Sequence, residues 1–171
     1  MKSMKVSVFA LSMMLVTSLT TDLHAQDNPS DIYLGGGLSY GESLNELGLQ
    51  FNGYYVFDEN LRFGGDFIYW LVDSPPEASV NYFEINGNAH YLFYQEDAIT
   101  MYGIGSLGIH YWSSSVTFNG MTASSSNTDL GLGIGAGIEY NVDPIKLYAE
   151  PRFFLTGFDQ LSLSFGVRYG L

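Results

Sequence analysis

The 171-residue chain has no cysteine and very few basic residues. Without cysteine, neither a disulfide framework nor thiolate chemistry is available to it. Lysine and arginine together number 6, against 18 aspartates and glutamates, and the formal net charge is −12. Binding to nucleic acid relies on lysine and arginine placed against phosphates, so a nucleic-acid partner is not expected.

The apolar run at the N-terminus is too short for a helix that spans a bilayer, and it is typical of a secretory signal peptide. Lys2 and Lys5 form a short basic region, residues 6–19 are mostly apolar, and the segment that ends at Ala25 offers a cleavage site. A transmembrane helix needs roughly 20 apolar residues. We therefore expect residues 1–25 to be a signal peptide and residues 26–171 to form one domain.

The chain that remains after cleavage is acidic, aromatic and rich in glycine. Four basic and 17 acidic residues would be left, which gives a net charge of −13. The full chain has 13 tyrosines, 12 phenylalanines and 20 glycines. A composition with many aromatics and few lysines favours a membrane barrel over a soluble sandwich.

The last eleven residues, LSLSFGVRYGL, alternate without a break between apolar side chains and small, polar or charged ones. This period of two gives a strand one apolar face and one polar face. Seven earlier segments show similar alternation. The eight predicted strands cover residues 32–40, 47–57, 61–71, 80–94, 99 to at least 112, 128–140, 145–155 and 161–171. Eight strands of about this length make the smallest barrel that crosses a bilayer.

The connections between the predicted strands alternate between short and mostly longer ones. The short turns are residues 58–60, 95–97 and 142–144, and the other connections are residues 41–46, 72–79, 113–127 and 156–160. With both termini in the periplasm, the short turns lie on that side of the membrane and the other connections lie outside. Asn119-Gly120 is a two-residue hairpin signal. The strands that flank it are therefore expected to pair beyond the membrane as a projecting ribbon.

The position of the charges separates a membrane barrel from a soluble one. All four basic residues beyond residue 25 lie on polar faces, together with four acidic residues. These eight are Arg62, Lys146, Arg152, Arg168, Asp66, Glu84, Glu139 and Glu150. The alternative, a soluble eight-stranded carrier of the lipocalin kind, would have an apolar interior and more lysine and glutamate on its exterior. The opposite arrangement favours apolar faces toward lipid and charged faces toward the lumen.

Together these features resemble the OmpA/OmpX-type small outer-membrane barrels of bacteria. In that family the last strand carries tyrosine or phenylalanine third from its end, as Tyr169 does, and most often ends in phenylalanine, from which Leu171 departs. The resemblance covers residues 32–171 and implies an all-β fold, an eight-stranded antiparallel up-and-down transmembrane β-barrel in the outer membrane. It also implies contact with outer-membrane lipid and a last strand that the barrel insertion machinery reads. We expect a monomer.

An eight-stranded barrel has room inside for side chains and little more. A buried arginine without a carboxylate is costly, so the inward arginines are expected to form a network with Asp66, Glu84 and Glu150. The alternating glycines of residues 131–137 leave a strip of the inner wall without side chains. Either bulky neighbours lean into this strip or the glycines ease tight curvature, and the two interpretations are compatible. The neighbours that could fill it are Tyr148, Arg152, His110 and Trp112.

Catalytic and cofactor chemistry finds little support in the sequence. The glycine run lacks the turn into a helix that aims backbone N–H groups at phosphate. His90 and His110 face inward from different strands, and a third metal ligand would require Glu84 or Asp66 at the same height by coincidence. Outer-membrane lipid A deacylases use a Ser–His pair that faces the lipid, which no serine matches here. We therefore expect no enzyme activity, no cofactor, and no catalytic or metal-binding residue.

Three classes of function remain. The first is a structural or surface-interaction barrel whose lumen is filled by a charged network. The alternatives are a small conduit for hydrophobic or small solutes and a lipid A-modifying enzyme. The outer connections carry acidic residues without lysine or arginine, which argues against direct pairing with lipopolysaccharide phosphates and leaves bridging divalent cations open. These acidic residues are Glu42, Glu46, Asp73, Glu77 and Asp159.

Overall fold

The computed structural model describes residues 31–75, 77–157 and 160–171. The predicted signal peptide, residues 1–25, and its cleavage site after Ala25 lie outside the described residues, as does Asp159. No helix in the described part of the chain is long and apolar enough to cross a membrane.

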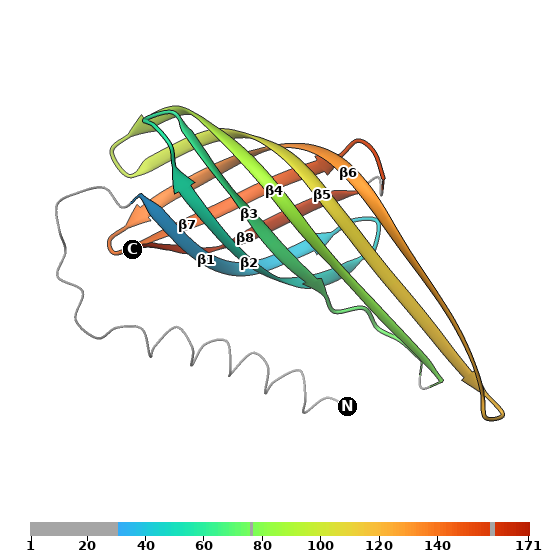
Figure 1. The fold of residues 1–171 in the computed structure, drawn as a ribbon. Coiled ribbons are helices and arrows are strands. Elements are labelled where there is room, and N and C mark those ends of the chain that lie inside the picture. Colours follow the sequence, from blue (N-terminus) through green and yellow to red (C-terminus); the bar gives the residue numbers. More distant parts are fainter. Residues whose placement is uncertain (1–30, 76, 158–159) are drawn as a thin grey trace.

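Eight strands form a single closed barrel in which each strand is antiparallel to the next and the last pairs with the first (Figure 1). The strands are β1 (Ile32–Gly41), β2 (Glu46–Val56), β3 (Leu61–Trp70), β4 (Ala78–Glu96), β5 (Ile99–Phe118), β6 (Met121–Val142), β7 (Ile145–Phe154) and β8 (Leu161–Gly170). The predicted up-and-down barrel of eight antiparallel strands is confirmed. Closure leaves no strand edge inside the membrane, where an unpaired backbone group would find no water.

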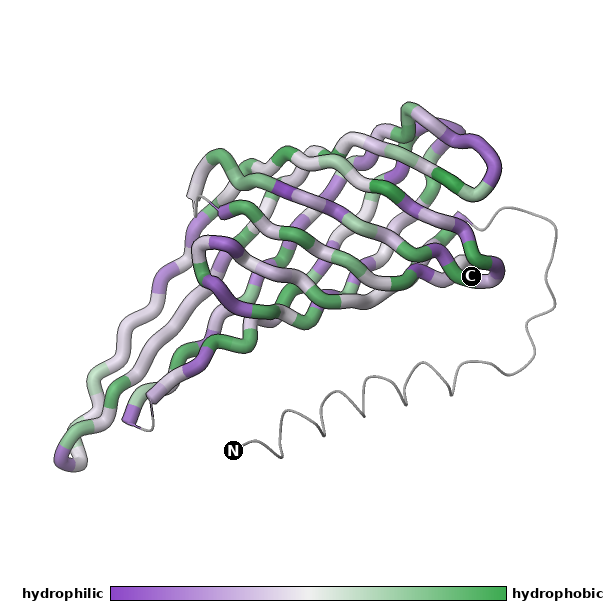
Figure 2. Tube along the Cα trace, turned by 180° about the vertical axis from the view of Figure 1, so that it is seen from behind, coloured by the Kyte–Doolittle hydropathy of each residue, from purple (hydrophilic) through white to green (hydrophobic). Residues whose placement is uncertain are grey.

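The two-residue period of each strand places apolar side chains outside and polar side chains inside. Figure 2 shows the resulting alternation of hydrophobic and hydrophilic residues along the strands. The outward Phe51, Leu132 and Ile134 are all more than half exposed, whereas the inward Gln50 and Arg168 are buried. Compared with a soluble barrel, the distribution of side chains is inverted, and the apolar outer surface is available to lipid.

Strands β4, β5 and β6 are 19, 20 and 22 residues long, about twice the length of the others. Their outer parts continue beyond the last pairs that β3 and β7 make with them, Trp70 with Tyr82 and Phe154 with Gly133. We call residues 78–81, 113–118 and 121–129 the ribbon. Figure 1 shows it projecting from the end of the barrel opposite the C-terminus.

The ribbon turns at Asn119 and Gly120, which have positive φ values of 49° and 78° respectively. Positive φ at both central residues is what a type I′ hairpin requires, and the predicted pairing of the flanking strands is confirmed. The pairing extends further than expected, because β5 ends at Phe118 and β6 begins at Met121. Serine and asparagine are common in connections, which is why the sequence alone assigned residues 113–127 to one.

The barrel closes where β1 meets β8, and two inward glycines face each other there. Gly37 is paired with Gly166, and a Cβ atom at Gly37 would overlap the carbonyl oxygen of Phe165. A Cβ atom at Gly166 would likewise overlap the carbonyl oxygen of Gly36. The two strands therefore approach each other at this seam too closely for a Cβ atom at either position.

We predict that Gly37→Ala lowers the yield of closed barrel, because its methyl group must push β1 away from β8. Gly105→Ala is the control, since no atom lies within 4 Å of a Cβ atom there. The measurement is the fraction of protein that changes its gel mobility on boiling. Equal folded fractions for the two variants would show that the seam does not depend on glycine.

Candidate functional site

The lumen holds three arginines and three carboxylates at its centre. Arg62 and Asp66 come from β3, Glu139 from β6, Glu150 and Arg152 from β7, and Arg168 from β8. Each of these side chains is buried, with at most 5% of its surface exposed. All six occupy inward positions of the two-residue period, so the alternation of the sequence is what brings them together.

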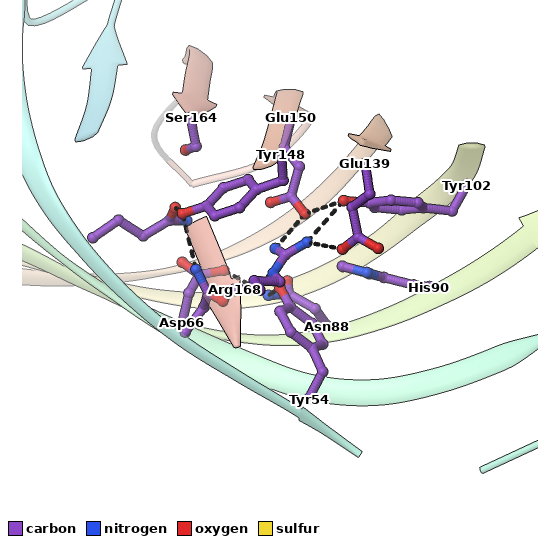
Figure 3. A network of polar contacts seen from close by, with 12 residues as sticks. Tyr54, Asp66, Asn88, His90, Tyr102, Glu139, Tyr148, Glu150, Ser164 and Arg168 are labelled. Carbon is purple, nitrogen blue, oxygen red and sulfur yellow. Dashed lines mark hydrogen bonds and ion pairs between the residues drawn. The ribbon is translucent and has the colours of Figure 1, made fainter. Parts of the chain in front are cut away.

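Arg168 lies at the centre of this group (Figure 3). Its Nη2 donates to Glu150 Oε1 at 2.6 Å, and its Nη1 pairs with Glu139 and donates to the hydroxyl oxygen of Tyr102. The expected pairing of Arg168 with Glu150 is therefore present. The guanidinium also lies 4.0 Å from the ring centroid of Tyr148, a cation–π contact that adds to its stabilisation.

Arg62 shares Glu139 with Arg168. Its two terminal nitrogens donate to both carboxylate oxygens of Glu139, at 3.0 and 2.7 Å, in a bidentate pair. Its Nε donates to Nδ1 of His90 at 3.0 Å, and the imidazole stacks on the ring of Tyr102. His90 is consequently an acceptor that orients an arginine.

Arg152 makes a separate pair with Asp66. Its terminal nitrogens lie 2.7 and 3.2 Å from the two carboxylate oxygens. Asn86 and Asn88 donate to the same carboxylate at 2.9 and 2.6 Å. The carboxylate accepts four hydrogen bonds, which is the extensive compensation that a buried charge needs.

Glu84 does not join the arginines, contrary to the sequence-based expectation. Its Oε1 accepts hydrogen bonds from Trp70 Nε1 at 2.8 Å and from Gln160 Nε2 at 3.2 Å, and lies 3.5 Å from His110 Nδ1. The side chain stands nearer the ribbon end of the lumen than the arginines do, as the strand pairing requires. Glu139 is the carboxylate that the arginines share instead.

Aromatic side chains and Arg152 occupy the glycine strip of β6. The Cβ positions of Gly135 and Gly137 are filled by Arg152 and by the ring of Tyr102, and Gly133 lies against Phe154. Of the predicted neighbours, Arg152 and His110 do lie against the strip, whereas Trp112 is 38% exposed and Tyr148 lies against Gly166. Tyr102 and Phe154 were not among the predicted neighbours of the strip, although both occupy inward positions of their strands.

Within the described residues, the two inward histidines contact other side chains of the lumen. His110 Nδ1 lies 3.2 Å from the hydroxyl oxygen of Tyr82, and no hydrogen bond joins either inward histidine to a serine among the described residues. Nor do residues 31–75, 77–157 and 160–171 contain a group of three His, Cys, Asp or Glu side chains placed to hold a metal ion. The hydroxyl groups of Ser164 and Ser39 form a hydrogen bond across the β1–β8 seam. These histidine and serine side chains thus have other side chains of the lumen as neighbours.

Comparison with known proteins matches residues 8–170 to the family model described as the outer membrane protein beta-barrel domain. Among solved structures, Neisserial surface protein A has a TM-score of 0.58 and 22% identity, covering 85% of this chain and 100% of that one. The attachment invasion locus protein Ail of Yersinia pestis has a TM-score of 0.57 and 18% identity, covering 85% and 98%. The N-terminal barrel domain of Pseudomonas aeruginosa OprF has a TM-score of 0.57 and 11% identity, covering 84% and 100%.

None of the curated protein sequences compared with this chain matches it. At these identities the three structures support the fold alone, and they are all small outer-membrane barrels.

We predict that Glu150→Ala destabilises the barrel by about 3–5 kcal/mol, because it removes one of the two carboxylates that Arg168 contacts and leaves three buried arginines with two carboxylates. The exposed Glu42→Ala is the matched control and should change stability by no more than about 0.5 kcal/mol. Reversible unfolding by urea in a lipid or detergent environment gives both values. A Glu150→Ala variant as stable as the control would mean that water reaches and compensates this site.

Proposed function

The chain belongs to the outer-membrane β-barrel domain family and is a bacterial outer-membrane protein, and on that premise we propose that it is a closed anchor that presents its ribbon for contacts at the cell surface. The observation that carries the proposal is the combination of ion pairs across the lumen with three strands that project from one end. The first would close the barrel to solutes, and the second would offer it a contact surface.

Two of the ion pairs join strands that are not neighbours in the barrel wall. Arg152 on β7 bonds to Asp66 on β3, and these strands are separated by three others in either direction. Arg62 on β3 likewise reaches Glu139 on β6. Side chains that meet across the full width of an eight-stranded barrel leave little room for a solute, which disfavours the conduit alternative.

The ribbon is available for a contact role because it is not part of the closed wall of the barrel. It lies beyond the pairs that close the wall, and its tip residues Phe118 and Met121 are 71% and 76% exposed. Two of the similar structures carry names that refer to a surface protein and to attachment and invasion. Those names describe those proteins, and they are compatible with a surface role for this one. We assign no catalytic role to the chain.

The remaining partners follow from the same proposal. We expect the outward apolar face to contact outer-membrane lipid, and the last strand, which ends at Leu171, to be read by the barrel insertion machinery. A barrel of this kind would be a monomer in its membrane, since each strand already has two neighbours.

We predict that the purified protein forms no steady channel. In a planar lipid bilayer the unmutated protein should leave the conductance at the level of the protein-free membrane, because the paired side chains occlude the lumen. Large, ohmic and long-lived conductance steps would overturn the closed-anchor proposal and favour the conduit.

We also predict that the ribbon faces outward from the cell. The chain has no cysteine, so single cysteines can be placed without background. A membrane-impermeant maleimide should label Ser125→Cys in the ribbon on intact cells. It should label Glu59→Cys, in a short turn at the opposite end, only after the outer membrane is permeabilised. The reverse pattern would place the ribbon in the periplasm and contradict the surface role.

A further inference from the structure

Pro151 lies within β7, a strand that has a neighbour on each side in the closed wall. Proline has no backbone N–H to donate to a neighbouring strand, so within sheets it is confined to edges, strand starts and bulges. The closed barrel has no edge, and Pro151 is neither the first nor the last residue of its strand. A proline at this position leaves a defect in the wall.

The defect appears in the pairing of β7 with β6. The pairs that flank it share one register, so no bulge compensates for it. These pairs are Gly135 with Arg152 and Ile138 with Ala149. The register places Ala136 opposite Pro151, and these two residues are not paired. We call this interruption the gap.

The group left without a partner at the gap is the carbonyl oxygen of Ala136. Leu155 N donates to the carbonyl oxygen of Leu132 on β6, and every second residue of β7 directs its backbone groups the same way. Pro151 is one of these residues, but it has no N–H to give to Ala136. Among the described residues, neither the strand pairing nor a turn supplies this oxygen with another donor.

The gap lies inside the apolar band of the wall. Ala136 faces outward, and the outward residues before and after it on β6, Ile134 and Ile138, are 56% and 41% exposed. Val142 ends β6 about 20 Å further along the strand, or about 14 Å along the membrane normal at a tilt of about 45°. The apolar band is about 25 Å tall, so the oxygen of Ala136 lies near its middle, where no bulk water is available to pair with it.

The outer surface beside the gap has little side-chain cover. Gly103 on β5 is paired with Ala136, and Gly105 is the next outward residue of the same strand. No atom lies within 4 Å of a Cβ atom at either glycine. On the other side of the gap β7 contributes the small Ala149. We call Gly103, Gly105, Ala136 and Ala149 the outer patch, which leaves space for a lipid chain against the wall.

The lumen side of the gap holds a donor without a partner. Arg152 follows Pro151, and its Cγ lies 2.6 Å from the Cβ position of Gly135, the residue before Ala136. Its terminal nitrogens donate to Asp66, whereas its Nε, in a side chain that is 1% exposed, has no hydrogen-bond partner in the described part of the chain. An unpaired acceptor and an unpaired donor therefore flank the same interruption. A hydroxyl group is able to donate to the first and accept from the second.

We propose that the gap between β6 and β7 binds the hydroxyl group of a hydroxylated acyl chain, carried by a membrane lipid or by a free fatty acid. The chain lies against the outer patch, its hydroxyl group donates to the carbonyl oxygen of Ala136, and the hydroxyl oxygen accepts from Nε of Arg152. The hydroxyl group belongs to the distal half of the chain, because the gap is near the middle of the apolar band. This inference goes beyond the proposed function and does not depend on which side of the membrane the ribbon faces.

Two other occupants fit the observations less well. A water molecule has the same donor and acceptor groups, but hydrocarbon supplies none from outside, and the ring of Tyr102 and the side chain of Arg152 fill the inner wall beside the gap. A second copy of the chain would bring the middle of its own outer wall against the gap. The outward side chains there, such as Phe51, Leu132 and Phe165, have no hydroxyl group to donate.

The test observes the carbonyl group of Ala136 directly by NMR. Ala136–Gly137 is the only Ala-Gly dipeptide in the sequence, so a protein with ¹³C in its alanine carbonyls and ¹⁵N in its glycines gives one carbonyl–amide correlation. The purified full barrel, in nanodiscs of dimyristoylphosphatidylcholine, is titrated with stearic acid hydroxylated at its twelfth carbon. A new hydrogen bond moves a carbonyl resonance downfield, so we expect a saturable downfield shift. Unmodified stearic acid is the control probe and should leave the resonance in place.

Pro151→Ala supplies the missing N–H and is the decisive variant. Its Ala136 carbonyl resonance should lie downfield without any probe, and the hydroxylated acid should bind about tenfold more weakly, as expected for the loss of one hydrogen bond. Gly103→Val should also weaken binding, because its side chain occupies the outer patch. Gly87→Val is the matched control, since this outward glycine lies outside the patch and has a single atom, 3.9 Å away, near its Cβ position. It should bind the acid as the unmutated protein does.

Each remaining outcome decides between the alternatives. No shift with the hydroxylated acid, or equal shifts with both acids, would overturn the proposal. A resonance of the unmutated protein that already coincides with that of Pro151→Ala before any probe is added would assign the gap to a water molecule and also overturn it.

A phosphatidylcholine that carries the same hydroxylated chain distinguishes the two sources of the ligand. A shift with this lipid as well as with the free acid supports a membrane lipid, and a shift with the acid alone supports a free fatty acid. Heat-dependent gel mobility verifies that each variant is folded. Neither conductance nor cysteine labelling reports on the gap, so failure of this inference is distinguishable from failure of the proposed function.

Discussion

The structure depends on the pairing of charges that are enclosed by a wall with lipid on its other side. Arginine side chains cannot leave this lumen for the apolar exterior, and each is matched by a carboxylate within hydrogen-bond distance. Glu139 serves both Arg62 and Arg168, so the pairs from β3, β6, β7 and β8 are tied to one another. Because removal of one member leaves a buried charge without compensation, the network favours one arrangement of the strands.

The ends of β4, β5 and β6 extend beyond the closed wall and beyond the paired charges of the lumen. The same two-residue period that sorts charge from apolar side chains in the barrel continues into these ends. There it gives one face of hydroxyl groups, such as that of Thr122, and one mixed face that is apolar only at its tip, where Phe118 pairs with Met121. Under the proposed function the barrel supports the ribbon, and among the described residues no strand pairs with the β6 edge of that ribbon.

Much of this fold follows from the sequence because residues along each strand of a barrel wall alternate between the inside and the outside. The alternation predicts the eight strands and the inward side of Arg168 and Glu150, and their pairing follows since β7 and β8 are neighbours. The partner of Glu84 did not follow, since the height of a side chain along the barrel depends on the stagger between strands, which no single strand encodes. The length of the ribbon was also underestimated, because serine-rich residues 113–127 have the composition of a connection. Only the cross-strand pairing stabilises them as strand.

The coupling between Asp66 and Arg152 tests the central claim most directly, because this pair spans the barrel and is separate from the pairs around Glu139. A double-mutant cycle with Asp66→Asn and Arg152→Gln, measured by reversible unfolding in lipid, isolates their interaction. A lumen held together by desolvated ion pairs predicts a coupling free energy of about 1.5 kcal/mol or more. Additive effects, with a coupling below about 0.3 kcal/mol, would contradict the account and indicate a lumen in which water screens the charges.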